Sequence, residues 1–187
     1  RALSAIITTK YENERALQEL QESEARLRHL ANHDSLSGLP NRHSFVTRVE
    51  DAAERYSRGD VRSLGVLLMD LDRFKLINDA YGHAAGDELI VQVGRRLRAL
   101  LPQEVLLARL SGDEFAMLFV DHAAKEPARI SELVLECLAR GVSLVTADVA
   151  VSASIGVALA SPQVCSAGAL MRLADGAMYK AKARGRG

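Results

Sequence analysis

An acidic turn joins two apolar segments near the middle of the chain, and it restricts the fold more than any other feature. Residues 105–110 and 114–120 are mostly Val, Leu, Ala and Phe, and the sequence RLSGDEF carries Gly112, Asp113 and Glu114 between the two segments. Short apolar segments around a turn with glycine predict a β-hairpin. A turn of Asn-Gly would serve equally well, so the adjacent carboxylates need a chemical explanation.

The rest of the chain alternates between extended and helical patterns. Two further strands are predicted, at residues 63–70 and 149–159. Helices are predicted at residues 1–31, 73–80, 84–101, 126–140 and 166–184, and over about 16 residues from Arg42. A hairpin inside this mixed order favours an α+β fold, with helices flanking a mostly antiparallel sheet, over a doubly wound parallel sheet.

The first 31 residues lack Gly and Pro and carry a heptad pattern. Its two series are Ile6, Asn13, Leu20 and Leu27, and Thr9, Ala16, Ser23 and Leu30. Asparagine at a core position favours a parallel dimer in one register. We therefore expect a coiled-coil linker helix at residues 1–31 and a globular domain at residues 32–187, joined by a connector at 32–42. The alternative is an amphipathic helix docked on its own domain.

Composition limits the class of partner and the compartment. Acidic and basic residues number 24 each, so no bulk positive field points to nucleic acid or an anionic membrane. Cys137 and Cys165 show neither metal-ligand spacing nor a disulfide framework, as expected in a reducing compartment. We expect a cytoplasmic domain. Because the chain starts without Met or a signal peptide, we also expect an upstream sensor or membrane segment in the full-length protein.

A second pair of carboxylates, Asp70 and Asp72, follows the first predicted strand of the domain. Asp72 can cap the helix that opens at Arg73. If the hairpin pairs beside this strand, its turn brings Asp113 to the edge that carries Asp70. Two carboxylates with a backbone carbonyl, such as that of Leu71, suit Mg²⁺, which usually also binds substrate phosphates. The spacing fits solvated strand ends and a turn rich in acids equally well.

Five sequence blocks resemble, in the same order, the GGDEF family of diguanylate cyclases. The blocks are DSLSGLPNR, MDLDRFKLINDAYGHAAGDELI, RLSGDEF, SIGVA and LADGAMYKAKARGR, and they cover residues 32–187. The resemblance implies a fold similar to the adenylyl cyclase catalytic domain and the polymerase palm. It also implies that two GTP are condensed into cyclic di-GMP and two pyrophosphates, with Mg²⁺ or Mn²⁺. Each domain would hold one GTP, so the active form would be a homodimer.

The resemblance gives roles to the residues around the acidic turn. Asp70, the Leu71 carbonyl, Asp113 and Glu114 would hold metal ions. Asp113 would also accept the proton of the attacking 3′ hydroxyl, and Glu114 would help to hold the second ion. Lys75 would stabilise the transferring phosphoryl group. An exposed helix lysine without function is the alternative for Lys75.

Further residues would bind the nucleotide. Guanine needs an acceptor for its N1 and N2 hydrogens and a donor for its carbonyl oxygen or ring nitrogen, and Asp87 and Asn78 supply these groups. His83 would lie beside the substrate, and Lys182 and Arg186 would contact the β and γ phosphates. The alternatives are helix-capping roles for Asn78 and Asp87 and support of the glycine-rich turn for His83. The alternative for the basic tail with Lys182 and Arg186 is solvated surface. If Gly185 ends the last helix early, Arg186 lies outside that helix.

The chain departs from the family pattern at two places. Ser111 replaces the first glycine of the signature, and if that position needs positive φ the serine costs roughly 1 kcal/mol. Residues 102–105, Pro-Gln-Glu-Val, stand where many members carry the Arg-x-x-Asp product site, so no tight product binding is expected there. Activity is predicted to be retained. The competing interpretations are a catalytically degenerate GTP-binding signalling module and a purely structural dimerisation domain.

Overall fold

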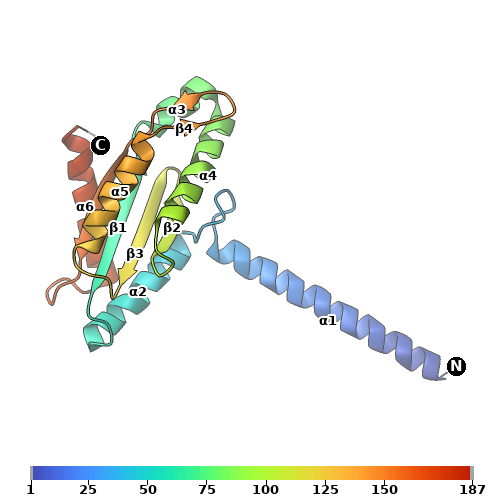
Figure 1. Cartoon of the computed structure of the whole chain (residues 1–187). Coiled ribbons are helices and arrows are strands. Elements are labelled where there is room, and N and C mark those ends of the chain that lie inside the picture. Colours follow the sequence, from blue (N-terminus) through green and yellow to red (C-terminus); the bar gives the residue numbers. More distant parts are fainter. Residues whose placement is uncertain (1, 186–187) are drawn as a thin grey trace.

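A four-stranded antiparallel sheet forms the centre of the domain, in the order β2-β3-β1-β6 (Figure 1). The computed structural model describes residues 2–185, with the side chains of residues 15–185 apart from 16 and 25. The strands are β1 (Leu64–Leu71), β2 (Leu106–Ser111), β3 (Glu114–Val120), β4 (Val142–Ser143), β5 (Asp148–Val149) and β6 (Ala153–Leu159). The helices are α1 (Ala2–Asn32), α2 (Arg42–Arg58), α3 (Phe74–Tyr81), α4 (His83–Leu100), α5 (Glu126–Ala139) and α6 (Ala167–Ala183). The predicted α+β class is confirmed.

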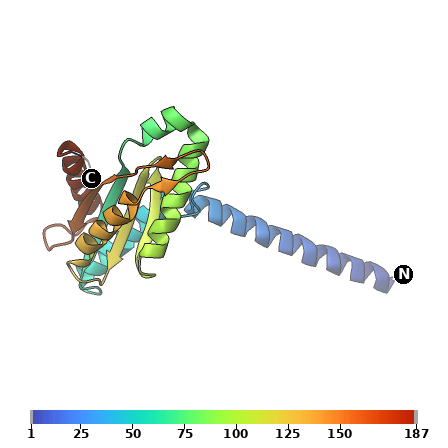
Figure 2. The ribbon, with the colours of Figure 1, turned by 45° about the horizontal axis from the view of Figure 1, so that its top comes forward.

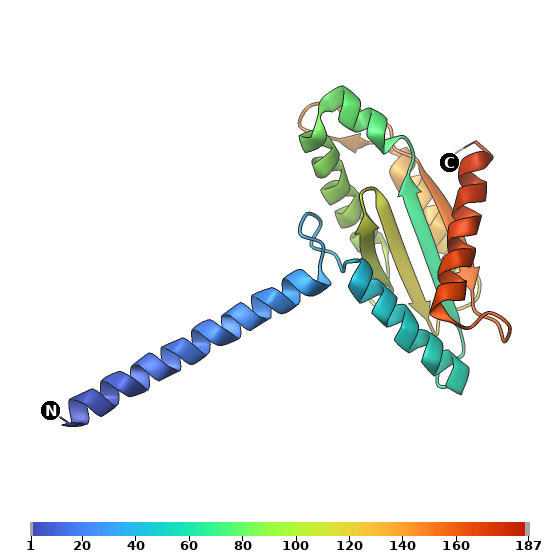
Figure 3. The same cartoon turned by 180° about the vertical axis from the view of Figure 1, so that it is seen from behind.

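Helices cover both faces of the sheet, which gives the domain two apolar cores (Figures 1 and 3). On one face, buried residues of α4 and α5 such as Leu89 and Ile130 pack against Leu67 and Met69 of β1. On the other face, α2 and α6 bury Phe45 and Leu170 against alternate residues of the same strand. Because β1 lies between β3 and β6 and is covered on both faces, it is apolar along nearly its whole length.

The predicted strand at residues 149–159 is wrong as one continuous element. Residues 153–159 form β6, while Asp148–Val149 form β5, which pairs with β4 in a separate two-stranded sheet. The break falls where β1 ends, since Leu71, the last residue of β1, pairs with Ala153. Asp72 follows, and its buried carboxylate accepts hydrogen bonds from the hydroxyls of Ser152 and Ser154, at 2.8 and 2.7 Å. The prediction that Asp72 caps the following helix is therefore also wrong. Helix α3 has Arg73 at its N-cap position, with positive φ and no side-chain cap.

Helix α1 projects away from the domain, and no other element lies along it (Figures 1 and 2). Its described leucines are open to solvent, with Leu20, Leu27 and Leu30 about 57, 64 and 62% exposed. The alternative of a helix docked on its own domain is therefore wrong for this part of the chain. The coiled coil stays a prediction, and the side chains of Ile6 and Asn13 lie outside the described residues. Within the described part, no helix is long and apolar enough to cross a membrane.

One asparagine joins α1 to α2. The side-chain oxygen of Asn41 caps α2 by accepting from the Ser44 N–H at 2.9 Å. Its side-chain nitrogen donates to the Ala31 carbonyl at the end of α1, at 2.8 Å. Both branches of one amide are thus engaged, so the end of α1 has a fixed position relative to the start of α2.

Candidate active site

The turn between β2 and β3 lies at the end of β1, so the condition under which Asp113 was expected beside Asp70 is met. Strand β3 pairs antiparallel with β1, and Asp70 stands opposite Glu114 in this register. One residue further, the Leu71 N–H donates to the Asp113 carbonyl at 3.2 Å. Asp70, Leu71 and Asp113 therefore come from two segments of the chain and meet at one edge of the sheet.

The charges at this edge are only partly balanced. Lys182, in the last turn of α6, forms an ion pair of 2.8 Å with Asp70, and the side chains are 29 and 15% exposed. Burial raises the pKa of Asp113, the negative charge of Asp70 raises it further, and the Lys182 ammonium opposes both effects. One ammonium does not neutralise two close carboxylates, so this edge favours an additional cation.

Glu114 is turned towards α2 rather than towards Asp113. Its carboxylate accepts a hydrogen bond from the Ser111 hydroxyl at 2.9 Å and faces the Arg42 guanidinium at 3.4 Å. Ser111 is absent from the described non-glycine residues with positive φ, whereas Gly112 has φ of 44°. The strain that Ser111 could have caused therefore does not arise. The role of Glu114 in holding a second ion stays a prediction.

Arg109 fixes the acidic turn to the connector. Its guanidinium donates twice to the Gly112 carbonyl, at 2.9 and 2.7 Å, and forms an ion pair of 2.8 Å with Asp34. Burial alone would raise the pKa of Asp34, but hydrogen bonds from Ser37 and Arg109 outweigh it and lower the pKa. Arg109, Arg42 and Asp34 were not predicted as site residues from the sequence. Their partners lie 72 to 75 residues away, and no local spacing indicates such pairs.

The predicted base-reading residues lie on α3 and α4, which meet at Gly82. Asn78 is half-buried within α3, and Asp87 is exposed in the second turn of α4. Neither is at a cap position, and neither helix has a side-chain N-cap bond, so the capping alternative is wrong for both. Lys75 on α3 and His83 at the start of α4 are exposed.

Two further predictions concern the C-terminal end. Helix α6 ends at Ala183, before Gly185, which has φ of 129°. Lys182 therefore belongs to the last helical turn and reaches Asp70 from there. Arg186 lies outside the described residues, and its phosphate contact stays a prediction.

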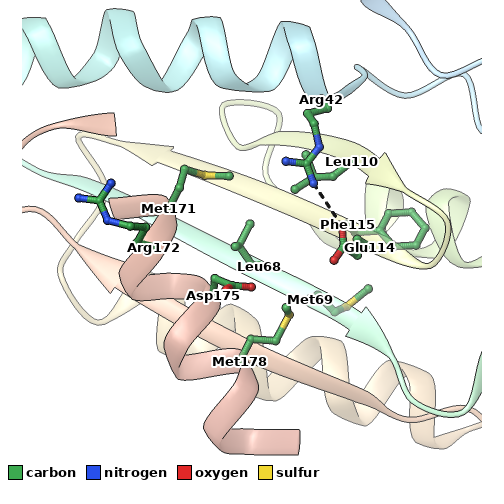
Figure 4. A pocket seen from close by; sticks show the side chains of 10 residues that line it. All are labelled: Arg42, Leu68, Met69, Leu110, Glu114, Phe115, Met171, Arg172, Asp175 and Met178. Atoms are coloured by element: carbon green, nitrogen blue, oxygen red, sulfur yellow. Dashed lines mark hydrogen bonds and ion pairs between the residues drawn. The ribbon is translucent and has the colours of Figure 1, made fainter. Parts of the chain in front are cut away.

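A cavity of about 220 Å³ opens between α2 and α6, beside the acidic turn (Figure 4). Its floor is apolar and includes Leu68 of β1, and Met178 of α6 forms one wall. Asp175, Glu114 and Arg42 contribute charged groups. Among the predicted site residues that the structure describes, Glu114 is the one that lines this cavity. The cavity is therefore a neighbour of the acidic edge and does not coincide with the predicted nucleotide site.

The donor set at the acidic edge fits a hard divalent cation. Among the described residues, no three or more His, Cys, Asp or Glu side chains are grouped to hold a metal ion. Mg²⁺, however, is commonly held by one or two carboxylates together with water and substrate phosphates. Asp70 and Asp113 supply two such carboxylates, and burial and the charge of Asp70 raise the pKa of Asp113.

Comparison with known proteins agrees with this geometry. The family model for the diguanylate cyclase GGDEF domain matches residues 31–187. The chain belongs to the GGDEF family. TpbB, a diguanylate cyclase of Pseudomonas aeruginosa, is 42% identical over 170 residues, which cover 90% of this chain and 39% of TpbB. MucR of the same species, a bifunctional diguanylate cyclase and cyclic di-GMP phosphodiesterase, is 41% identical over 157 residues, or 84% of this chain and 23% of MucR.

A solved structure resembles this GGDEF domain together with its N-terminal helix. The coiled coil and GGDEF domain of DgcB from Caulobacter crescentus, in complex with c-di-GMP, aligns with a TM-score of 0.88 and 28% identity. The alignment covers 100% of this chain and 97% of DgcB in that structure. The chain itself spans only 23 to 39% of the length of MucR and TpbB.

Proposed function

We propose that this GGDEF domain is a diguanylate cyclase that condenses two GTP into cyclic di-GMP and two pyrophosphates. The main support is the meeting of Asp70 and Asp113 at one sheet edge, with the Lys182 ammonium beside them. The relatives named diguanylate cyclases agree with this activity. Because Ser111 adopts no strained backbone conformation, it gives no reason to regard the signature as degenerate.

The residues of the chain divide the chemistry between them. Asp70, Asp113 and the Leu71 carbonyl would hold Mg²⁺, with Mn²⁺ as a substitute and Glu114 at a second ion. When bound, such ions lower the pKa of the 3′ hydroxyl and neutralise charge on the phosphates. Asp113 takes the hydroxyl proton. Burial and the negative charge of Asp70 raise its pKa, which makes it a stronger base than a solvated aspartate.

Substrate recognition uses α3, the N-terminal part of α4 and the C-terminal end. Asp87 accepts the N1 and N2 hydrogens of guanine and Asn78 donates to its carbonyl oxygen or ring nitrogen, so GTP is preferred over ATP. Lys75 stabilises the transferring phosphoryl group and His83 lies beside the substrate. Lys182 exchanges part of its pairing with Asp70 for the β and γ phosphates, and Arg186 joins it there.

Purified protein with Mg²⁺ and GTP, followed by chromatography of the products, tests the proposal. We expect cyclic di-GMP and pyrophosphate in a ratio of one to two. GTP binding without any cyclic dinucleotide over hours at micromolar protein would instead identify the degenerate signalling module. The absence of both binding and turnover would contradict both proposals.

The reaction needs two domains that face each other, each with one GTP, and the N-terminal helix would keep the two domains together. A parallel coiled coil raises the effective concentration of the pair to about the millimolar range. Deletion of residues 1–30 keeps the Ala31 carbonyl that Asn41 binds. We expect this variant to lose specific activity steeply on dilution below micromolar concentration, while the complete chain does not. Equal specific activity of both proteins on dilution would remove this role from α1.

The contacts of the loop before β2 support the prediction that this loop holds no tight product site. Arg98 on α4 donates to the carbonyls of Leu101, Pro102 and Val105, at 3.2, 2.6 and 3.0 Å, so its guanidinium is occupied by the loop itself. We expect calorimetry to detect no submicromolar binding of cyclic di-GMP to the nucleotide-free protein. We also expect GTP turnover to continue undiminished when micromolar product is added. Submicromolar binding that disappears when Arg98 is replaced by Ala would contradict this prediction.

A further inference from the structure

Gly86 in α4 packs directly against the Asn78 side chain of α3. A Cβ atom at position 86 would overlap the Asn78 Oδ1 and would lie 2.9 Å from its Cγ and 3.1 Å from the Phe74 Cζ. Real Cβ atoms essentially never approach another atom closer than 3.0 Å. The Asn78 amide therefore occupies the space that a side chain at position 86 would need.

The backbone around Gly82 brings the two helices this close. The Gly82 N–H donates to the Asn78 carbonyl at 2.8 Å, and the Gly86 N–H donates to the Gly82 carbonyl at 3.3 Å. Gly82 has φ of 84°, a value that side-chain-bearing residues rarely adopt. The chain therefore reverses sharply between α3 and α4, and residue 86 is placed over residue 78.

The Asn78 amide is held in place by packing, and its hydrogen-bonding groups are not used within the described part of the domain. None of the side-chain hydrogen bonds of the described residues involves this amide, although the residue is half-buried. Its oxygen lies against Gly86, so the amide nitrogen, on the other branch, is left as a donor. Asp87, the predicted acceptor for the same base, follows Gly86 directly in the chain.

We propose that Gly86 is a positioning residue for guanine selectivity. By lacking a side chain it holds the Asn78 amide where its nitrogen can donate to the base. This inference rests on the proposed function, because it assigns a cause to the preference for GTP. An alanine at position 86 forces the flexible Asn78 side chain to rotate. The fold survives, but the amide nitrogen of Asn78 leaves the position from which it donates to the base.

Binding of nucleotides that cannot react tests the proposal. The probes are 3′-deoxy-GTP and 3′-deoxy-ATP with Mg²⁺, measured by calorimetry on the wild type, Gly86→Ala, Asn78→Ala and the double variant. Loss of one hydrogen bond to the base predicts binding of 3′-deoxy-GTP about tenfold weaker in each variant. The adenine nucleotide should bind equally to all four proteins. The double variant should bind no more weakly than Asn78→Ala alone, because the displaced amide is already absent.

The possible results separate the two proposals. A wild type that prefers 3′-deoxy-GTP, together with a Gly86→Ala variant that keeps the same preference, contradicts the positioning role alone. Losses that add in the double variant also contradict it. A wild type that binds neither nucleotide contradicts the proposed function, and the positioning role then falls with it.

Thermal unfolding supplies a readout that is independent of nucleotide. Gly176→Ala is the matched control, since Gly176 is an exposed helical glycine with no atom within 4 Å of its ideal Cβ position. Ala is the better helix former, so this control should raise Tm by about 2–4 °C. We expect Gly86→Ala to raise Tm less than this in the wild type and more in the Asn78→Ala background. Equal shifts in both backgrounds would show that the two residues do not compete for space.

Discussion

Asp113→Asn is expected to reduce cyclic di-GMP formation about 10³-fold or more while the domain stays folded. Asn keeps the shape of the side chain but supplies neither the negative charge for a cation nor the basicity to take the proton of the 3′ hydroxyl. The measurement is initial velocity with Mg²⁺ and GTP. Asp79→Asn on α3 is the matched control, because it makes the same chemical change at an exposed residue with no role in the site.

The same substitution should not weaken the folded state. The folded pKa of Asp113 is raised above its unfolded value, so without metal the ionised carboxylate is unfavourable in the folded protein. This group favours folding at pH below the unfolded pKa of about 3.9, and that contribution is lost as pH rises through the folded pKa. We therefore expect metal-free Asp113→Asn to unfold at or above the wild-type temperature at pH 7. Activity within tenfold of wild type, or a large drop in Tm, would contradict the account.

Arg109→Ala is expected to lower the free energy of unfolding by about 2–3 kcal/mol. The Arg109 and Asp34 side chains are only 11 and 24% exposed. Removal of the guanidinium leaves the half-buried Asp34 carboxylate with its hydrogen bonds from Ser37 alone, and the Gly112 carbonyl loses both bonds from Arg109. Activity should fall as well, because Gly112 directly precedes Asp113. Chemical denaturation measures the change. Arg58→Ala is the control, since it removes an ion pair with Asp60 whose two side chains are more than half exposed, and it should have little effect.

The loss caused by Arg109→Ala should depend on pH. The folded pKa of Asp34 is lowered, so its stabilising contribution is present above the unfolded pKa of about 3.9 and is lost as pH falls through the folded pKa. The difference in unfolding free energy between wild type and variant should therefore shrink below about pH 4. A difference that is constant from pH 7 to pH 3 would mean that the ion pair with Asp34 contributes nothing.

Periodic features of the sequence predicted most of the fold. The hairpin follows from two short apolar segments around a turn with glycine. The pairing of β3 beside β1 entered only as the condition under which Asp113 reaches Asp70, and the structure meets that condition. The predicted helices agree with α2 to α6 within about two residues at each end, as expected for boundaries that fray. The interruption before β6 was missed, because residues 150–152 continue the alternating pattern and only the pairing of Ala153 with Leu71, the last residue of β1, shows where the strand begins.

Polar contacts between distant segments could not be predicted. The pairs of Arg109 with Asp34 and of Arg42 with Glu114 join residues 75 and 72 positions apart, and ion pairs have no sequence period. The same limit applies to Gly86, which in the sequence is one small residue in a helical pattern. Its importance depends on the Asn78 side chain lying across it, and this contact exists only after α3 and α4 have folded back on each other.

The activity losses expected for both variants depend on one claim, that carboxylates from β1 and from the hairpin hold a divalent cation under the phosphates of GTP. Anomalous diffraction from crystals grown with Mn²⁺ and 3′-deoxy-GTP tests it most directly. The account predicts a manganese peak at about 2.1–2.2 Å from carboxylate oxygens of both Asp70 and Asp113, next to the nucleotide phosphates. An ordered nucleotide whose manganese ion contacts neither carboxylate would contradict it.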